Sequence, residues 1–212
     1  MLVNQDRKNS SELRLLKATG NALDRYIPAL ADLRIGVFKE YPYLYDGNAD
    51  YEARYLQTYR DAEGCIVVIV LDGDRVVGAS TALPLSEETD EVKAPFLAGR
   101  YEPQGVFYLG ESVLLPAYRG RGLGVRFFEE REQHARILAK QRGRPFDWFA
   151  FCAVQRAEDD PRRPEGYAPL DRFWKKRGYR CHPELTTTFS WQELGESEET
   201  AKPITFWLKP AD

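Results

Sequence analysis

The sequence is poor in the residues that would indicate a metal centre, a disulfide framework or a membrane anchor. It has two histidines and three cysteines, and the cysteines Cys65, Cys152 and Cys181 are far apart and odd in number. No close pair suggests zinc, and no framework suggests secretion. No apolar run comes near the ~20 residues that a spanning helix needs, and the start, MLVNQDRKNSSELRLL, lacks the pattern of a signal peptide. We therefore expect a cytoplasmic protein with no metal and no membrane partner.

An excess of charge of one sign is also missing. The chain has 30 Lys and Arg against 33 Asp and Glu, a net charge of −3. A nucleic-acid binder usually has a basic face that shows in this balance, so we expect no nucleic-acid partner. What the chain does have is 43% hydrophobic residues in 212, enough for a sizeable core. This length favours a single domain over 1–212, with a polar and loosely held tail over 1–10.

Periodicity and turn residues predict helices on the faces of a mixed sheet. The stretch "CIVVIVLDGDRVVGASTAL" predicts a hairpin, because Asp-Gly favours the tight turn between two β-branched runs. An acidic stretch after it is expected to be irregular. The other expected strands are 13–18, 105–115, 146–154, "LTTTFSW" and "ITFWLK", and the expected helices are 22–40, "YEARYLQTYR", 122–142 and "LDRFWKKRGY".

The most informative stretch is "LLPAYRGRGLGVRFFEE", residues 114–130. An apolar run ends at a proline, three glycines follow at alternate positions, and an amphipathic run begins at once. Glycines allow positive φ and close approach of the backbone to a ligand. A helix start offers unpaired N–H groups and partial positive charge. A strand that leads through such a turn into a helix therefore predicts an anion site suited to phosphate.

Two common phosphate motifs do not fit this turn. A nucleotide P-loop would need Gly-Lys-Ser/Thr at the helix start, and the dinucleotide fingerprint needs Gly-x-Gly-x-x-Gly, whereas position 125 is Val. "RGRGLG" does fit Arg/Gln-x-x-Gly-x-Gly/Ala. With "VLLPAY" before it and the helix after it, the segment resembles the acyl-CoA-binding motif of the GNAT acyltransferase superfamily, most closely over 111–138. "PLDRFWKKRGY" resembles a later helix of that family.

The resemblance implies an α+β fold with a central, mostly antiparallel sheet of about seven strands flanked by helices. It also implies acetyl-CoA as the acyl donor and a primary amine as the acceptor. By position in the motif, the end of the strand would bind pantetheine and the turn would bind the pyrophosphate through its N–H groups. The implied cofactor-binding residues are Val113, Leu114, Arg119, Gly120, Arg121, Gly122, Leu123 and Gly124.

Acyl transfer to an amine needs a neutral nucleophile, a donor to the thioester oxygen and a proton for the departing thiolate. Glu111 is the candidate base, because a carboxylate inside an apolar strand needs a wet cavity or a partner; pairing with an arginine is the alternative. By resemblance, the N–H of Leu114 is the oxygen donor. The family often has a tyrosine where this chain has Trp174, which cannot act as an acid. Tyr167 nearby is the candidate acid, with another phenol or solvent as alternatives.

The acceptor is expected to be a small-molecule amine held by "EYPYLYDGNADYEARYLQTY", whose aromatic and acidic residues suit a cation. Tyr41, Tyr43 and Tyr45 are the candidate substrate-binding residues. An aromatic helix pair packed on the sheet explains part of this pattern equally well. A longer acyl donor, a protein amine as acceptor and a CoA-binding sensor without turnover stay open as alternatives. A homodimer is one possibility for the assembly.

Overall fold

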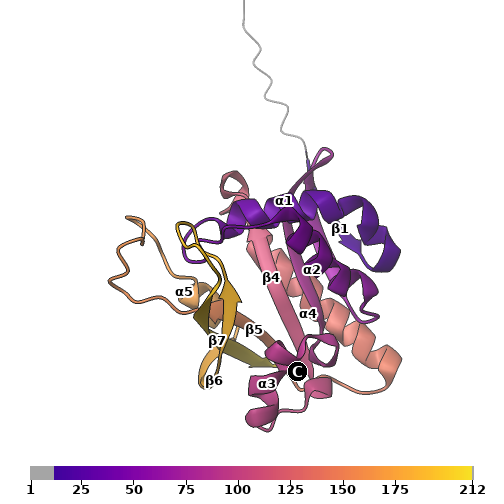
Figure 1. Ribbon diagram of the computed structural model, residues 1–212. Helices are drawn as coiled ribbons and strands as arrows, with labels where there is room; N and C mark the ends of the chain where they lie inside the picture. The colour runs from indigo at the N-terminus through magenta and orange to yellow at the C-terminus, as the bar shows by residue number, and fades with distance from the viewer. Residues whose placement is uncertain (1–11, 212) are drawn as a thin grey trace, which may run out of the picture.

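The computed structural model describes residues 12–211, which form a seven-stranded sheet with helices on both faces (Figure 1). The predicted tail over 1–10 lies outside the described residues. The strand order is β1-β2-β3-β4-β5-β7-β6, and every neighbouring pair is antiparallel except β4 and β5. The expected mixed, mostly antiparallel sheet is thus confirmed. The strands are β1 Leu13–Ala18, β2 Ile66–Asp72, β3 Arg75–Pro84, β4 Val106–Leu114, β5 Trp148–Val154, β6 Arg180–Trp191 and β7 Thr200–Pro210.

The helices divide the core into two layers. Helices α1 and α2 cover one face of the sheet and α4 covers the other. Strand β2 shows why both faces need a cover, since Val67 and Ile69 are buried under α1 and α2 while Val68 and Val70 are buried under α4. The helices are α1 Ile27–Phe38, α2 Ala49–Asp61, α3 Asp90–Ala98, α4 Leu123–Arg142 and α5 Asp171–Lys175, and a 3-10 helix, η1 Gly20–Tyr26, precedes α1.

The sequence-based prediction differs from the structure at two helices. The expected helix over 22–40 is a 3-10 turn followed by α1, with Pro28 in the first turn of the α-helix, where its missing N–H costs nothing. The acidic stretch after the hairpin, expected to be irregular, contains α3. Pro95 lies inside α3, and a proline in the interior of a short segment argues against a helix. Buried contacts of Val92 and Phe96 stabilise α3 nevertheless.

A bulge in β4 changes which way its side chains face. Thr81 pairs with Glu111 and Leu83 pairs with Tyr108, so β4 has one more residue than β3 between these pairs. Because strand side chains alternate, one extra residue turns every later side chain to the other face. Tyr108 and Val113 therefore both belong to the core under α1 and α2, although they are five positions apart.

Strands β4 and β5 separate soon after they begin. They pair from Val106 and Trp148 only as far as Tyr108 and Ala150. Beyond that point β4 stays on β3 and β5 stays on β7, and Figure 1 shows the two strands diverging. The diverging halves leave the inner edges of β4 and β5 without a strand partner. We call this opening the β4–β5 gap.

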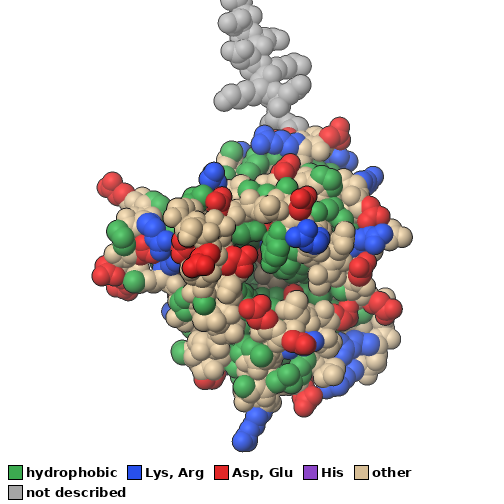
Figure 2. Space-filling model, in the orientation of Figure 1, with side chains coloured by type: hydrophobic (Ala, Val, Ile, Leu, Met, Phe, Trp, Pro, Cys, Tyr) green, Lys and Arg blue, Asp and Glu red, His purple; other side chains and the backbone are tan. Residues whose placement is uncertain are grey.

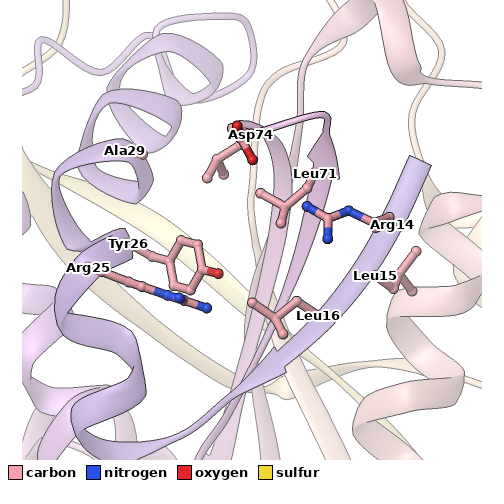
Figure 3. A pocket seen from close by; sticks show the side chains of 9 residues that line it. Arg14, Leu15, Leu16, Arg25, Tyr26, Ala29, Leu71 and Asp74 are labelled. Atoms are coloured by element: carbon pink, nitrogen blue, oxygen red, sulfur yellow. The ribbon is translucent and has the colours of Figure 1, made fainter. Parts of the chain in front are cut away.

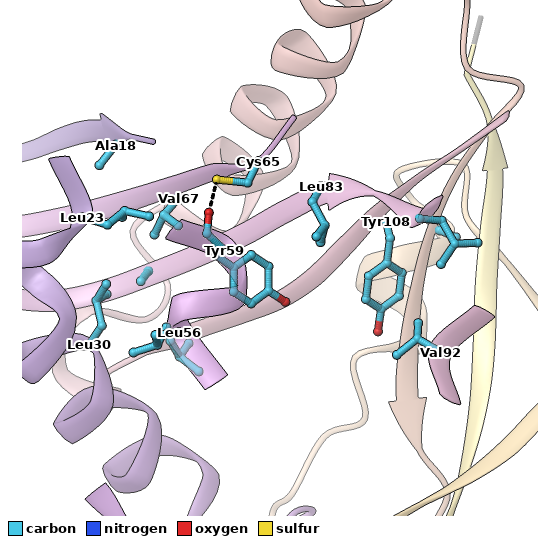
Figure 4. Close-up of a cluster of buried hydrophobic side chains, with 14 of the residues drawn as sticks. Ala18, Leu23, Leu30, Leu56, Tyr59, Cys65, Val67, Leu83, Val92 and Tyr108 are labelled. Carbon is cyan, nitrogen blue, oxygen red and sulfur yellow. Dashed lines mark hydrogen bonds between the residues drawn. The ribbon is translucent and has the colours of Figure 1, made fainter. Parts of the chain in front are cut away.

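Tyrosines occupy the core beside this gap. Tyr59 of α2 and Tyr108 of β4 are buried among aliphatic side chains such as Leu56 and Leu83 (Figure 4). The Tyr59 hydroxyl lies 2.9 Å from that of Tyr55. Buried phenols keep a polar atom inside an apolar core, and they need partners of this kind.

No helix within residues 12–211 combines the length and the apolar character needed to span a bilayer.

Candidate active site

The turn predicted to bind phosphate, residues 119–124, has the backbone conformation that its glycines allow. Gly120 has φ +75° and Gly122 has φ +80°, both in the left-handed region that other residues rarely adopt. Gly122 is the N-cap of α4 and provides no side chain to cap the helix. A Cβ atom at either glycine would meet nothing within 4 Å. The space over this glycine turn is therefore open.

The glycine turn presents a row of free N–H groups. Arg119 donates to the carbonyl of Pro116 at 3.1 Å, and Val125 donates to that of Gly122 at 3.0 Å. The five N–H groups between them, from Gly120 to Gly124, have no acceptor among the described residues. They lie at the positive end of a 20-residue helix whose first turn holds no acidic side chain. This arrangement fits a diphosphate.

The two arginine side chains of the turn already have protein partners. The Arg119 guanidinium donates to Glu40 at 2.9 Å and to the carbonyl of Leu114 at 3.0 Å. Arg121 donates to the carbonyl of Ala117 at 3.0 Å and lies over the Tyr118 ring. In this arrangement both arginines offer a ligand the positive charge of their side chains. Arg121 also offers its backbone N–H.

The end of β4 faces the gap with unpaired backbone groups. The N–H of Leu115 donates to Val77 of β3 at 3.0 Å. Because neighbouring residues of a strand point their N–H groups to opposite edges, the N–H of Leu114 points to the β4–β5 gap. Val113 is fully buried in the core, so only its backbone could contact a ligand. Leu123, the first residue of α4, packs its side chain into the core under that helix and offers a ligand only its N–H.

Glu111 is ion-paired on the side of the sheet covered by α1 and α2. Its carboxylate meets the guanidinium of Arg34, which also holds Glu52 of α2. All three side chains are at most 9% exposed. The bulge makes this contact geometrically feasible, because without the extra residue Glu111 would face α4.

Sequence reasoning missed Arg34. Its signal was present, since Arg34 stands beside Leu30, Leu33 and Val37 on the apolar side of a helix, where a lone charge needs a partner. Burial opposes the charge of Arg34, but the neighbouring Tyr55 and Glu52 outweigh burial and raise the pKa of Arg34. The guanidinium lies 4.3 Å from the centre of the Tyr55 ring. Arg34 therefore stays charged, and it is ion-paired with two carboxylates, Glu52 and Glu111.

Two phenols lie near Cys152 of β5. Burial is the main cause that raises the pKa of Tyr43, with further contributions from Cys152 and Tyr167. The hydroxyl of Tyr108 lies 3.1 Å from the sulfur of Cys152 on β5, and burial raises the pKa of this thiol to about 11. Tyr43 and Tyr108 thus stay protonated at neutral pH, and Cys152 stays a thiol.

The candidate acid Tyr167 lies in the long connection after β5. Its ring meets that of Tyr41 edge to face, with the ring centres 4.7 Å apart. Burial, followed by the neighbouring Tyr41, raises the pKa of Tyr167, so its hydroxyl carries a proton to donate. Trp174 packs against Phe151 and Trp207, with the ring centres 5.0 Å apart in each pair.

The segment over 39–48, which contains Tyr41, Tyr43 and Tyr45, connects α1 to the far side of the gap. Tyr45 forms a bridge with Glu193 in the loop between β6 and β7. In the same loop Leu194 donates to the carbonyl of Leu44 at 2.8 Å, and Trp191 at the end of β6 donates to that of Tyr43 at 3.0 Å. Since α1 packs on β3 and β4 while β6 lies beyond β5, the segment spans the gap.

One buried carboxylate fixes this crossing. Glu193 is 1% exposed and is ion-paired with Arg156 and Arg162. Arg156 follows β5 and also donates to the carbonyl of Pro42 at 2.7 Å. The 39–48 segment is therefore held both by the end of β5 and by the β6–β7 loop. Of the candidate substrate residues, Tyr43 interacts with Cys152 and Arg34. Burial, followed by Glu52, raises the pKa of Tyr45.

The surface of the described residues is hollowed in more than one place. Figure 2 shows a hollow near the middle of the face on which Figure 1 draws β4, bordered by acidic and basic side chains. Another, a cavity of about 500 Å³, lies between β1, η1, α1 and the β2–β3 hairpin, with Arg14, Tyr26 and Leu71 in its lining (Figure 3). It includes no residue of β4, β5 or the glycine turn, so it is separate from the candidate site.

The sequence and the fold are similar to those of acetyltransferases. The family model described as "Acetyltransferase (GNAT) family" matches residues 30–142, more than half of the chain, from α1 to the end of α4. No curated protein sequence matches the chain.

Solved structures match over almost the whole chain. They include Arabidopsis thaliana NAA60 in complex with acetyl-CoA (15% identity, 94% of this chain and 98% of that one, TM-score 0.57). Ribosomal-protein-alanine N-acetyltransferase from Brucella melitensis matches with 15% identity over 93% of this chain and 99% of that one, at a TM-score of 0.56. The yncA acetyltransferase of Salmonella typhimurium, solved with acetyl-CoA, matches with 11% identity over 94% of each chain, at a TM-score of 0.55. At these identities the likeness shows the fold.

Proposed function

Because the chain belongs to the acetyltransferase (GNAT) family, we propose that it transfers the acetyl group of acetyl-CoA to the primary amine of a small molecule. In this proposal the amine attacks the thioester directly. The observation that carries the proposal is the glycine turn between β4 and α4, where five N–H groups have no acceptor among the described residues. The same strand borders the β4–β5 gap, so a molecule bound at the turn can extend along an open strand edge.

The proposed donor site uses the backbone more than side chains. The N–H groups from Gly120 to Gly124 would hold the diphosphate together, since one helix-end interaction contributes only about 0.3–1 kcal/mol. The open edge of β4 at Val113 and Leu114 would bind pantetheine. The N–H of Leu114 would then donate to the thioester oxygen and stabilise the charge that develops there.

The acceptor amine must lose a proton before or as it attacks, because a lysine-like amine has a pKa near ~10.4. We assign this role to Glu111, acting directly or through a water molecule. The Glu111 carboxylate is ion-paired with Arg34 on this side of the sheet, where it could accept the proton. Glu52 shares the same cation, so Arg34 is not held by Glu111 alone.

The departing thiolate needs a proton, and the phenols of the gap can supply one. Tyr167 is the first candidate, and Tyr43 is the second. Both have a raised pKa, so both hydroxyls are protonated and can donate a hydrogen bond to the thiolate as it forms. Trp174 takes no part in this transfer, because an indole N–H does not act as an acid.

The small size of the acceptor is inferred from the 39–48 segment. Its bonds to the β6–β7 loop cross one end of the gap, and in this proposal they leave less room for an extended polypeptide than for a small molecule. A small amine needs only the aromatic and acidic wall beneath the segment.

Release of free thiol from acetyl-CoA tests the proposed function. A panel would compare small primary amines with peptides that carry a free α-amino group or a lysine. We expect release with one or more small amines and not with the peptides. Turnover of peptides alone would show that the acceptor is a protein amine and not a small molecule. Turnover of longer acyl thioesters alone would show that acetyl-CoA is not the donor. Tight binding of acetyl-CoA without release for any amine would contradict the enzyme and favour a CoA-binding sensor.

A further inference from the structure

Arg131, on α4, is buried inside the protein without a carboxylate partner. It is 1% exposed, and none of the ion pairs between the described residues includes it. Its guanidinium instead makes four hydrogen bonds to neutral oxygens. It donates to the carbonyls of Phe127 at 3.0 Å, Thr81 at 3.2 Å and Glu111 at 2.9 Å, and to the hydroxyl of Ser112 at 3.0 Å.

Three of these acceptors belong to the β3–β4 ladder where the β4 bulge ends. Thr81 is on β3, and Glu111 and Ser112 are on β4. Thr81 and Glu111 are register partners, and the extra residue of β4 lies between Glu111 and Tyr108. A bulge disrupts the ladder and leaves backbone groups to be satisfied in another way. One guanidinium nitrogen bonds both carbonyls, and another bonds the next residue, Ser112.

A buried charge without a counter-charge is costly, and an apolar side chain would usually be the more stable choice at such a position. Packing alone therefore does not explain an arginine here. Burial lowers the pKa of Arg131 to about 10, which still leaves it charged at neutral pH. Its charge lies directly beneath Glu111 and Ser112, one residue before the strand end that faces the gap.

We infer that Arg131 is a positioning residue for acetyl transfer, which holds the bulged part of β4 so that the N–H groups beyond it face the thioester. The inference rests on the proposed function. The guanidinium fixes the strand from the α4 side, while the ligand would lie along its open edge. Its positive charge beneath the strand also favours the negative charge that develops on the thioester oxygen.

The test compares Arg131→Met and Arg131→Lys with Arg136→Met. Arg136 lies on the same helix, is half-exposed and contacts Glu132 at 3.5 Å, so it controls for the loss of an α4 arginine. The measurements are kcat, the KM for acetyl-CoA, and the carbonyl stretching band of bound, carbon-13-labelled acetyl-CoA. Displacement of a reacting group by ~1 Å can lower the rate of the chemical step about 100-fold.

For Arg131→Met we expect kcat to fall about 100-fold, with a KM for acetyl-CoA within about threefold of wild type. The carbonyl band should move towards that of free acetyl-CoA. Arg131→Lys keeps the charge with fewer donors, so its kcat and band should lie between those of wild type and Arg131→Met. Arg136→Met should match wild type in all three measurements.

An unchanged kcat and carbonyl band in folded Arg131→Met would overturn the inference, as would an equal loss in Arg136→Met. If Arg131→Met does not fold, Arg131→Lys decides: a lower kcat with an unchanged KM supports the inference, and wild-type kinetics overturn it. Failure of the wild-type protein to bind acetyl-CoA would instead overturn the proposed function, and the inference with it.

Discussion

Arg34 joins two carboxylates that come from different elements, Glu52 of α2 and Glu111 of β4. At the scale of single residues this triad sets the electrostatics of the gap. Removing one member of a buried ion pair is costly, since it leaves an uncompensated charge. Here either carboxylate can be neutralised while Arg34 keeps the other. The triad therefore allows the role of Glu111 to be separated from its contribution to stability.

We predict that Glu111→Gln lowers kcat by about 10²–10⁴-fold, the usual contribution of a general base, and leaves the affinity for acetyl-CoA nearly unchanged. Glu52→Gln is the matched control, because it removes the other partner of Arg34 at an equally buried position. Steady-state kinetics and calorimetric binding of acetyl-CoA provide the two readouts. Equal losses of kcat in both variants would show that the effect passes through Arg34 and would remove Glu111 from the role of base.

What the sequence could predict at this scale was local. The glycine turn and Glu111 stand out in the printed sequence because each breaks a pattern, the first by spacing and the second by a charge in an apolar run. The partner of Glu111 could not be predicted with the same ease. It depends on the extra residue in β4, which decides the face on which Glu111 lies.

At the scale of elements, α4 has a glycine in the left-handed conformation at each end. Gly122 begins the helix with φ +80°, and Gly143 ends it with φ +66°. A Cβ at either position would meet nothing within 4 Å. The two positions therefore impose similar backbone strain on any other residue, of about 1–3 kcal/mol, but only one of them belongs to the proposed phosphate site.

We predict that Gly122→Val weakens binding of CoA by about tenfold or more, because a change of 1.4 kcal/mol in contacts with the turn corresponds to a tenfold change in Kd. Because the backbone strain is similar, Gly143→Val should lower the thermal midpoint by about as much as Gly122→Val does. It should leave the Kd for CoA at its wild-type value. Calorimetric titration with CoA, together with thermal unfolding of each variant, separates the two effects. Unchanged affinity in folded Gly122→Val would contradict the proposed phosphate site.

Elements with a strong local pattern were predictable and those stabilised by distant contacts were not. The Asp72-Gly73 hairpin and the strand, turn and helix around residues 106–142 follow from alternation, glycine and periodicity. Helix α3 carries Pro95 in its interior, and contacts of Phe96 with Tyr101 and with the distant Phe206 stabilise it. Because Phe206 belongs to β7, the local sequence pattern around the proline predicts a loop.

At the scale of the whole molecule, charges join the region after β5 to the β6–β7 loop. The hydrogen bonds from Arg162 lower the pKa of Asp160 to about 2. The backbone N–H of Glu193 and the ammonium of Lys202 lower the pKa of Glu196 to about 2 as well. Both carboxyl groups have higher pKa values in an unfolded chain, about 3.9 and 4.3.

A carboxyl group whose pKa is lower in the folded state stabilises that state above its unfolded pKa, and the contribution is lost as pH falls towards the folded value. We therefore predict that the thermal midpoint declines between about pH 4 and about pH 2, and that Asp160→Asn and Glu196→Gln make this decline shallower. Asp90→Asn is the control, because the Asp90 side chain is fully exposed and pairs with Lys93 on the same helix, α3. Equal acid profiles in all four proteins would show that these contacts do not contribute.

The central claim is that the glycine turn binds the diphosphate of CoA and directs the thioester along β4 into the gap. An amide NMR titration of nitrogen-15-labelled protein with CoA tests this claim most directly. We predict that the amide signals of Gly120, Gly122 and Gly124 move together with that of Leu114 as CoA is added. Saturable binding that leaves these four signals in place and moves others, such as those around the cavity between β1 and α1, would contradict the account.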